Sequence, residues 1–264
     1  MRFARALLFG LLAWLAALTA APRAADTLHV MVSGAFTAPY NVLVAEWQKT
    51  SGHTVATAYG ASMGGTPTSI PNRLARGEPA DVVIMARSAL DALTKAGRIV
   101  DGSQVDLVRS RIGMAVKAGT TPPDISTEAR FRQVLLAAKS VAYSDSASGV
   151  YISTQMFKTL GIADQMAAKS RKVEGTPVGD VVATGEAELG FQQISELLPV
   201  RGITLVGPIP ASVQLITIFS GGIVVTSRAP EAARQLLAYL SSTDAAETIR
   251  RSGLDPVVAT GPAR

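Results

Sequence analysis

The chain has 264 residues, of which 48% are hydrophobic and 17% are charged, a composition typical of a globular protein with one or two packed cores. It contains no cysteine, which excludes disulfide scaffolds, thiolate metal sites and a cysteine nucleophile. With 23 glycines, 14 prolines and no internal repeat, the sequence also excludes collagen-like, disordered and solenoid architectures.

Residues 1–25 have the three-part pattern of a secretory signal peptide. Residues 1–5 carry two arginines, an apolar run follows from Ala6 to Leu18, and an alanine-rich stretch ends at Ala25. The run is shorter than the ~20 apolar residues that span a bilayer, so we expect cleavage and a periplasmic protein rather than a membrane anchor. The arginines of this segment leave with it, which lowers the net charge from +5 to +2.

The remaining chain alternates predicted strands with predicted helices. A strand at 28–32 runs into a polar turn and then a helix at 39–49. Further strands are expected at 54–59, 81–85, 112–116, 140–143, 188–191 and 203–206, and further helices at 70–75, 88–96, 131–138, 150–160 and 178–184. This alternation predicts an α/β protein with parallel-rich sheets flanked by helices.

The length of the mature chain suits two lobes rather than one doubly wound core. Charged residues at 105–111 and the Gly-Pro-Ile-Pro stretch at 207–210 are the expected places where the chain changes lobes. We therefore expect one lobe from 26–108 plus 211–264 and a second from 109–208, with a hinge and a ligand cleft between them.

Three polar turns share one physical form, in which a strand leads through Gly, Ser and Thr into a helix. They lie at 33–37, 60–66 and 144–149. Free backbone N–H groups and the positive end of a helix converge at such turns, and small residues permit close approach. Because parallel strands place these turns along one edge, the sequence predicts a small-anion site between the lobes, although each serine taken alone is also a suitable helix cap.

The sequence motifs of hydrolases and of nucleotide-binding proteins are incomplete or absent in this chain. Residues 60–64 fit the G-x-S-x-G hydrolase pattern, but that pattern needs a histidine later in the chain, and His29 and His53 both precede Ser62. Thr66 stands where a phosphate loop has its lysine, and no G-x-G-x-x-G fingerprint is present. We therefore expect no cofactor and no metal. No Arg/Lys cluster with interleaved aromatic residues predicts nucleic-acid binding, and nothing requires more than a monomer.

Charged and phenolic groups near the predicted edge are candidates for ligand contact. Arg87 follows the strand at 81–85, and its planar guanidinium suits a carboxylate if it turns inward, or solvent if it does not. Asp145, inside the third turn, is a candidate helix cap, counter-ion for Arg87 or general base. Tyr151 adjoins the same turn and is a candidate hydrogen-bond donor or a packing residue.

Five segments give the chain a family resemblance. They are 30–36, 59–62, 77–86, 148–161 and 185–191, of which the Gly-Glu-Pro-Ala-Asp block at 77–81 is the most specific. In these segments the sequence resembles the periplasmic molybdate-binding proteins and, more widely, the type II solute-binding proteins of ABC transporters. The resemblance covers nearly all of the mature chain and implies two α/β lobes around a cleft.

The family's oxyanion contacts carry over only in part. Ser62 matches a ligand serine, and the turn at 148–149 matches backbone contacts, but Ala35 stands where another ligand serine is expected and Gln192 where a tyrosine usually stands. Arg87 replaces an acidic or small residue. These departures favour an organic polycarboxylate over molybdate.

Two functions are compatible with this pattern, and the sequence favours the first, because it requires only the shared cleft. The first is a solute receptor that closes its lobes around a small anion and delivers it to an ABC transporter permease. The alternative is a periplasmic isomerase of the aconitate isomerase type, which moves a C=C bond by a proton shift and would use Asp145 and Tyr151. The expected ligand-binding residues are Ser33, Gly34, Ala35, Ser62, Met63, Arg87, Ser146, Ser148, Gly149, Tyr151 and Gln192.

Overall fold

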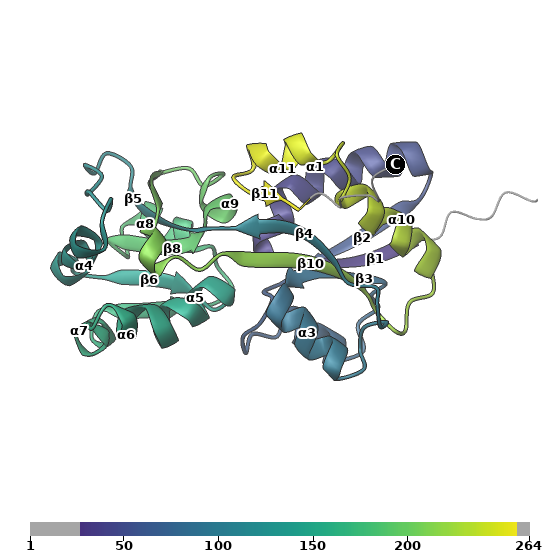
Figure 1. The fold of residues 1–264 in the computed structure, drawn as a ribbon, viewed down its shortest axis with the longest axis horizontal. Helices are drawn as coiled ribbons and strands as arrows, with labels where there is room; N and C mark the ends of the chain where they lie inside the picture. The colour runs from purple at the N-terminus through teal and green to yellow at the C-terminus, as the bar shows by residue number, and fades with distance from the viewer. Residues whose placement is uncertain (1–26, 258–264) are drawn as a thin grey trace, which may run out of the picture.

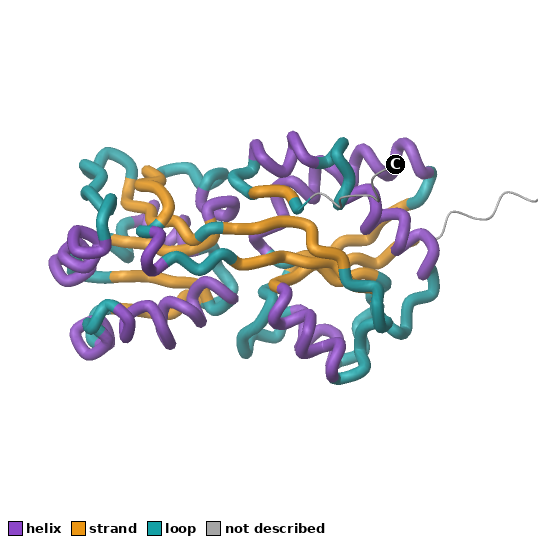
Figure 2. The backbone as a smooth tube through the Cα atoms, viewed as in Figure 1, coloured by secondary structure: helices purple, strands orange, loops and turns teal. Residues whose placement is uncertain are grey.

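The computed structural model describes residues 27–257, so the expected signal peptide at 1–25 lies outside the described residues. Two mixed sheets lie side by side along the long axis of the molecule, each with helices packed against it (Figure 1). The view coloured by secondary structure makes the same division visible, with strands inside and helices outside (Figure 2). None of the helices within 27–257 is long and apolar enough to cross a membrane.

The first lobe is built on a six-stranded sheet of order β11-β4-β10-β3-β1-β2. Its strands are β1 (Thr27–Val32), β2 (Thr54–Tyr59), β3 (Val82–Ala86), β4 (Val105–Ser110), β10 (Thr217–Ile223) and β11 (Asp255–Pro256). Its helices are α1 (Gly34–Ser51), α2 (Ile70–Ala75), α3 (Arg87–Lys95), α10 (Pro230–Leu240) and α11 (Ala246–Arg251). Strands β1, β2 and β3 pair in parallel, whereas β10 is antiparallel to β3 and β4.

The second lobe is built on a five-stranded sheet of order β7-β6-β8-β5-β9. Its strands are β5 (Ile112–Lys117), β6 (Val141–Ser144), β7 (Ser170–Val173), β8 (Leu189–Gln193) and β9 (Ile203–Pro208). Its helices are α4 (Glu128–Ala137), α5 (Ala147–Tyr151), a π-helical turn (Ile152–Met156), α6 (Phe157–Thr159), α7 (Ala163–Ala167), α8 (Val178–Thr184) and α9 (Ile194–Leu197). Strand β6 is parallel to β7 and β8, and β5 is antiparallel to β8 and β9. The α/β class is therefore confirmed, and the sheets are mixed.

Two neighbouring segments connect the lobes. Strand β4 ends at Ser110 and β5 begins at Ile112, so the charged stretch expected to be a connector is itself a strand that continues almost directly into the second sheet. The return segment, 209–216, contains a short 3₁₀ turn (Ala211–Val213) and leads into β10. The Gln214 side chain joins the two segments, because its Oε1 accepts from the Ile112 N–H at 2.9 Å and its Nε2 donates to the Ile112 carbonyl at 2.9 Å.

Helix α1 begins at Gly34, five residues earlier than the sequence pattern suggested. The proline at position 39 was read as the start of the helix but lies inside it. Proline has no N–H, so the carbonyl of Ala35, four residues before it, receives no bond from that position of the helix. The hydroxyl of Ser195, from the second lobe, donates to this carbonyl at 2.7 Å. The early start of α1 therefore creates a contact between the lobes.

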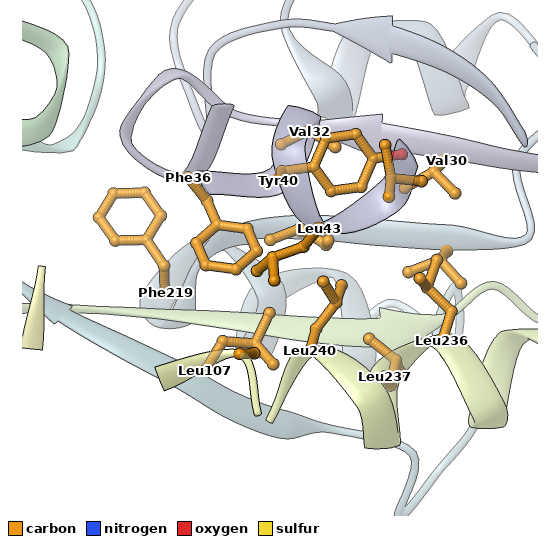
Figure 3. Packing of buried hydrophobic residues seen from close by; sticks show 14 of the residues in the cluster. Val30, Val32, Phe36, Tyr40, Leu43, Leu107, Phe219, Leu236, Leu237 and Leu240 are labelled. Carbon is orange, nitrogen blue, oxygen red and sulfur yellow. The ribbon is translucent and has the colours of Figure 1, made fainter. Parts of the chain in front are cut away.

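The main core of the first lobe holds the N-terminal half of α1 against the sheet and α10. Aromatic side chains from α1 and β10 meet leucines from α10 and β4 in one cluster, labelled in Figure 3 as Val30, Val32, Phe36, Tyr40, Leu43, Leu107, Phe219, Leu236, Leu237 and Leu240. Burying each such large side chain contributes roughly 1.5–3 kcal/mol to folding. This packing fixes the position at which α1 begins, at the carboxyl end of β1.

Candidate functional site

A cavity of about 380 Å³ lies between the lobes and is lined by the turns that follow β1 and β2 of the first lobe and β6, β7 and β8 of the second. Strands β1 and β2 pair in parallel, and β6 is parallel to both β7 and β8, so the carboxyl ends of these strands meet at one edge of each sheet, where open α/β sheets bind ligands. The volume suits a small organic molecule. Polar turns from both lobes thus line one cavity, as the sequence pattern led us to expect.

Direct contacts between the lobes border this cavity. The Ser62 N–H of the first lobe donates to Ser146 Oγ of the second at 3.3 Å, and Ser195 donates to Ala35 as described above. At the hinge side, Ser110 Oγ donates to Gln193 Oε1 at 2.7 Å, and Gln193 Nε2 donates to Thr217 Oγ1 at 3.3 Å. The two lobes are therefore in contact through polar groups on several sides of the cavity.

Helix N-termini supply hydrogen-bond donors to the cavity. Ser33 is the N-cap of α1 and Ser146 is the N-cap of α5, and neither side chain caps its own helix. The Ser33 hydroxyl is buried without a hydrogen-bond partner in the protein. The first N–H groups of a helix have no partner within it and carry the positive end of the helix dipole. Together, these groups make the cavity suitable for a negatively charged or carbonyl-bearing ligand.

Hydroxyl groups from both lobes add further donors to the cavity. Ser144 Oγ and Ser148 Oγ are 3.0 Å apart, and both residues line the cavity. Thr66, Thr68 and Thr176 line it as well. Serine and threonine hydroxyls both donate and accept hydrogen bonds, so they can adapt to a ligand's oxygens without adding charge.

Two carboxyl groups, Asp145 and Glu196, face the cavity, and both come from the second lobe. Burial raises the pKa of Asp145, and its Oδ2 is buried without a hydrogen-bond partner. Burial, reinforced by the nearby charge of Asp145, raises the pKa of Glu196 from 4.5 to about 7, even though Gln192 and the Gln193 backbone donate hydrogen bonds to it. The cavity therefore holds carboxyl groups that retain protons far more readily than exposed ones.

None of the described residues that line the cavity is Lys, Arg or His, although the charge of Lys172, outside the lining, opposes the rise in the pKa of Asp145. Within residues 27–257, moreover, no three His, Asp or Glu side chains are grouped as ligands for a metal ion. An anion in this cavity would be held by backbone dipoles and hydroxyls rather than by a cation. This arrangement differs from the arginine clamp considered from the sequence.

Seven residues singled out from the sequence line the cavity. They are Ser33, Gly34, Ala35, Asp145, Ser146, Ser148 and Gln192. Both polar atoms of the Gln192 amide form hydrogen bonds within the protein. Its Oε1 accepts from the Val178 N–H at 2.9 Å, and its Nε2 donates to Glu196 Oε1 at 2.9 Å. Its role here is to orient Glu196 and the start of α8.

Arg87 lies elsewhere, and the structure corrects its expected place in the cleft. At the start of α3, its guanidinium donates to Asp91 Oδ1 at 2.8 Å and to Asp106 Oδ1 at 2.6 Å, and it does not line the cavity. Asp91 stands one helical turn after Arg87, so part of this pairing was visible as an i,i+4 pair in the sequence. Both acidic partners hold the arginine on the surface of the first lobe.

The other candidates that do not line the cavity are Ser62, Met63, Gly149 and Tyr151. Ser62 is fully buried, and its Oγ accepts from the Ala86 N–H at 2.8 Å, while Met63 packs against the two cores of the first lobe. Tyr151 packs against the second-lobe core and donates to the Val213 carbonyl at 2.8 Å, on the segment that returns to the first lobe.

Gly149 does not line the cavity but packs against the end of β6, next to residues that do. A Cβ atom at this position would lie 1.6 Å from the Ser144 carbonyl oxygen, so only glycine lets α5 pack this closely on the end of β6. The residue thus shapes the turn that carries Asp145 and Ser148.

Glu196 is the functional candidate that sequence reasoning missed. It stands on a short helix at the carboxyl end of β8, which pairs in parallel with β6, the strand that carries Asp145 at its own end. The run Gln192-Gln193-Ile194-Ser195-Glu196 contains no Gly-Ser-Thr turn, so it did not match the pattern used to find the other three. A search for polar residues after every predicted strand would have included it.

Comparison with known proteins identifies the family. A family model described as bacterial extracellular solute-binding protein matches residues 28–255. Among curated proteins, an aconitate isomerase from Pseudomonas sp. is 51% identical over 233 residues, covering 88% of this chain and 89% of the relative. The molybdate-binding protein ModA of Azotobacter vinelandii is 28% identical, covering 90% of this chain and 93% of the relative.

Solved structures share the fold at lower identity. The periplasmic molybdate-binding protein of Azotobacter vinelandii superposes with a TM-score of 0.69 at 21% identity, covering 86% of this chain and 98% of that one. The sulfate-binding protein SubI from Mycobacterium tuberculosis superposes with a TM-score of 0.70 at 17% identity, covering 88% and 87% of the two chains. With two lobes on mixed sheets around one cavity, and a family model that matches most of its length, this chain belongs to the bacterial extracellular solute-binding protein family.

Proposed function

We propose that this protein is a periplasmic, cofactor-independent isomerase that moves the C=C bond of a small unsaturated tricarboxylate, converting trans-aconitate into cis-aconitate. The observation that carries this proposal is the pair of carboxyl groups with raised pKa, Asp145 and Glu196, in a cavity without a basic side chain. A receptor for an anion gains nothing from two acids in its site. An enzyme that moves a proton needs such groups.

The similarity to a named enzyme supports the same proposal. A relative described as an aconitate isomerase is 51% identical over 88% of this chain, whereas the molybdate-binding relative is 28% identical. The sequence pattern alone led us to prefer the receptor. The absence of a cationic clamp from the described cavity and the presence of a second acid reverse that preference.

The reaction is a 1,3 proton shift. A base removes a proton from the methylene carbon, the electron pair of that C–H bond forms the new C=C bond, and the electrons of the old double bond take a proton at the former vinylic carbon. The product is again an aconitate with its double bond moved, so atoms and charge balance without an oxidant. We assign the base to Asp145, because this residue lines the cavity and burial raises the pKa of its carboxyl group.

The charge that develops in this reaction is delocalised onto substrate carboxylate oxygens. The N-terminus of α1 and the hydroxyls of Ser33 and Ser148 supply donors for such charge. Tyr151, considered from the sequence as a proton carrier, already donates to a backbone carbonyl outside the cavity. The proposed mechanism therefore relies on carboxyl groups rather than on a phenol.

The purified protein should convert trans-aconitate into cis-aconitate in the presence of a metal chelator, monitored by proton NMR in D₂O. Deuterium at the new methylene carbon reports a proton shift rather than a simple rotation. Stoichiometric binding of trans-aconitate without conversion between about pH 6 and 8 would contradict the proposal.

A receptor for a polycarboxylate is the second candidate function, and the membership of the chain in a solute-binding family favours it. In that case the closed lobes would present the loaded ligand to an ABC transporter permease. A thermal-shift panel of aconitate isomers, citrate, tricarballylate and molybdate separates the ligand classes, because only a ligand of the folded state raises Tm.

A further inference from the structure

Glu196, the second carboxyl group of the cavity, is held in place by contacts with both lobes. It stands on α9, and its Oε1 accepts from Gln192 Nε2 at 2.9 Å. The same carboxyl group lies against the first turn of α1 in the other lobe, because a Cβ atom on Gly34 would be 2.0 Å from Oε1 and 2.9 Å from Cδ. The second lobe thus places an acid directly on a helix N-terminus of the first.

Asp145 has a matching arrangement on another turn. A Cβ atom on Gly64 of the first lobe would be 2.8 Å from the Asp145 carbonyl oxygen and 3.3 Å from its Oδ2. Both acids therefore come from the ends of neighbouring strands β6 and β8, and both rest against a glycine of the opposite lobe. Contact between the lobes brings the two acids and the donor groups of the first lobe around one cavity.

The surroundings of Glu196 favour a protonated carboxyl group near neutral pH. Burial is the main cause of the raised pKa, the charge of Asp145 adds to it, and the hydrogen bonds from Gln192 and the Gln193 backbone oppose it. The first turn of α1, which faces Glu196, is Gly34-Ala35-Phe36-Thr37 and contains no titratable group. Asp145 is the charged group that raises the pKa of Glu196 further.

We infer that Glu196 is the second acid–base residue of the isomerisation, positioned by Gln192 and by the space that Gly34 leaves. This inference rests on the proposed function. When Asp145 takes the proton from the methylene carbon, the Glu196 O–H bond breaks and its proton forms the new C–H bond at the former vinylic carbon. Asp145 ends protonated and Glu196 ionised, and exchange with solvent or reaction in the opposite direction restores the starting state.

Glu196→Gln is the direct test, because the amide keeps the shape of the side chain but cannot transfer a proton. We expect kcat for trans-aconitate to fall by roughly 10²–10⁴-fold, with the dissociation constant of tricarballylate, measured by calorimetry, changed little. Glu231→Gln, an exposed change on α10, is the matched control and should retain full activity. Circular dichroism and Tm establish that each variant is folded.

The pH profile of kcat/KM separates a chemical role from a structural one. In the unaltered protein, activity should decline above about pH 7 as Glu196 loses its proton, and this alkaline limb should be absent from the residual activity of Glu196→Gln. Glu196→Asp should restore part of the rate, because it returns a transferable proton on a shorter side chain.

Gly34→Ala gives a second, independent test. Its Cβ displaces the end of the Glu196 side chain, which is flexible, so the fold should survive while kcat falls by roughly tenfold or more through lost alignment. Full wild-type kcat and pH profile in Glu196→Gln would overturn the inference while leaving the proposed function intact. No conversion by the unaltered protein would overturn both.

Discussion

The two lobes contribute opposite kinds of group to the cavity between them. The first lobe supplies neutral donors and small residues, through the N-terminus of α1 at 33–35 and the turn after β2. The second lobe supplies both carboxyl groups, Asp145 and Glu196. The N-terminus of α1 and the two carboxyl groups line one cavity only when the lobes are in contact, so the proposed chemistry depends on that contact.

Gly34 and Gly149, on opposite sides of this cavity, leave space for different kinds of group. Gly34 of the first lobe leaves space for a side chain of the other lobe, whereas Gly149 of the second lobe leaves space for the backbone of its own lobe at Ser144. A side-chain end can move away at little cost, but a backbone oxygen held in a strand cannot. The same substitution should therefore affect function at one position and folding at the other.

Gly149→Ala should produce the largest loss of stability. Its Cβ would stand 1.6 Å from the Ser144 carbonyl oxygen, so α5 must shift away from β6, at an expected cost of about 3 kcal/mol or more. Chemical denaturation of this variant beside Gly34→Ala measures the difference. Equal stability of the two variants would contradict the different packing of Gly34 and Gly149.

The pH dependence of stability should reveal the carboxyl groups of the second lobe. The folded protein raises the pKa of Glu196 from 4.5 to about 7, so between these values it holds a proton that the unfolded chain has released. The stabilising contribution of this raised pKa is complete below about pH 4.5 and is lost as the pH rises through 7.

Glu196→Gln removes this titration and should therefore gain Tm relative to the unaltered protein as the pH rises from about 5 to about 8. Thermal denaturation monitored by circular dichroism across this range gives the measurement. A Tm difference that stays constant with pH would show that folding does not raise the pKa of Glu196.

Two serines of the first lobe should separate folding from binding. Ser62→Ala leaves the buried Ala86 N–H without its acceptor and should cost about 1–3 kcal/mol of stability. Ser33→Ala removes a buried hydroxyl that has no partner in the protein, so stability should change little, while affinity for a carboxylate ligand should weaken by about five- to tenfold. Chemical denaturation measures the stability of both variants, and calorimetry measures their affinity for the ligand. A loss of stability in Ser33→Ala, with a loss of affinity in Ser62→Ala, would contradict these assignments.

Arg87→Ala should have the smallest effect. The arginine is partly exposed and pairs with Asp91 and Asp106, so its loss should cost about 1 kcal/mol or less. Ligand affinity should be unchanged, because the residue does not line the cavity. A strong loss of carboxylate binding in calorimetry would return Arg87 to the site that the sequence suggested.

Much of the fold was predictable because it depends on local patterns. The helix at 178–184 and the start of β5 at Ile112 match their expected positions, since apolar periodicity and turn residues act over a few positions. The antiparallel return of β10 was not predictable from such patterns, because it depends on how the segment from 209 to 216 crosses back between the lobes. The start of α1 at Gly34 was missed because Pro39 resembled a helix start.

The sequence predicted the edge of the sheets at which the candidate site lies, but not the full set of side chains that face the cavity. Serines in the turns after β1 and β6 line the cavity as expected from strand direction. Whether a side chain points into the cavity depends on the phase of a helix and on partners distant in sequence. Arg87 donates to Asp106, and Tyr151 donates to the Val213 carbonyl. Gln192 donates to Glu196, and the packing of the second lobe places this pair at the cavity.

By itself, the amino-acid sequence determined the α/β class, the order of most elements and the polar turns, because these follow from short-range periodicity and the properties of glycine, serine and threonine. Only the tertiary structure decided which charges face the cavity. Burial of a carboxyl group and its distance from another arise when separate strands and two lobes come together. The acidic, cation-free character of the described cavity is therefore a property of the assembled lobes.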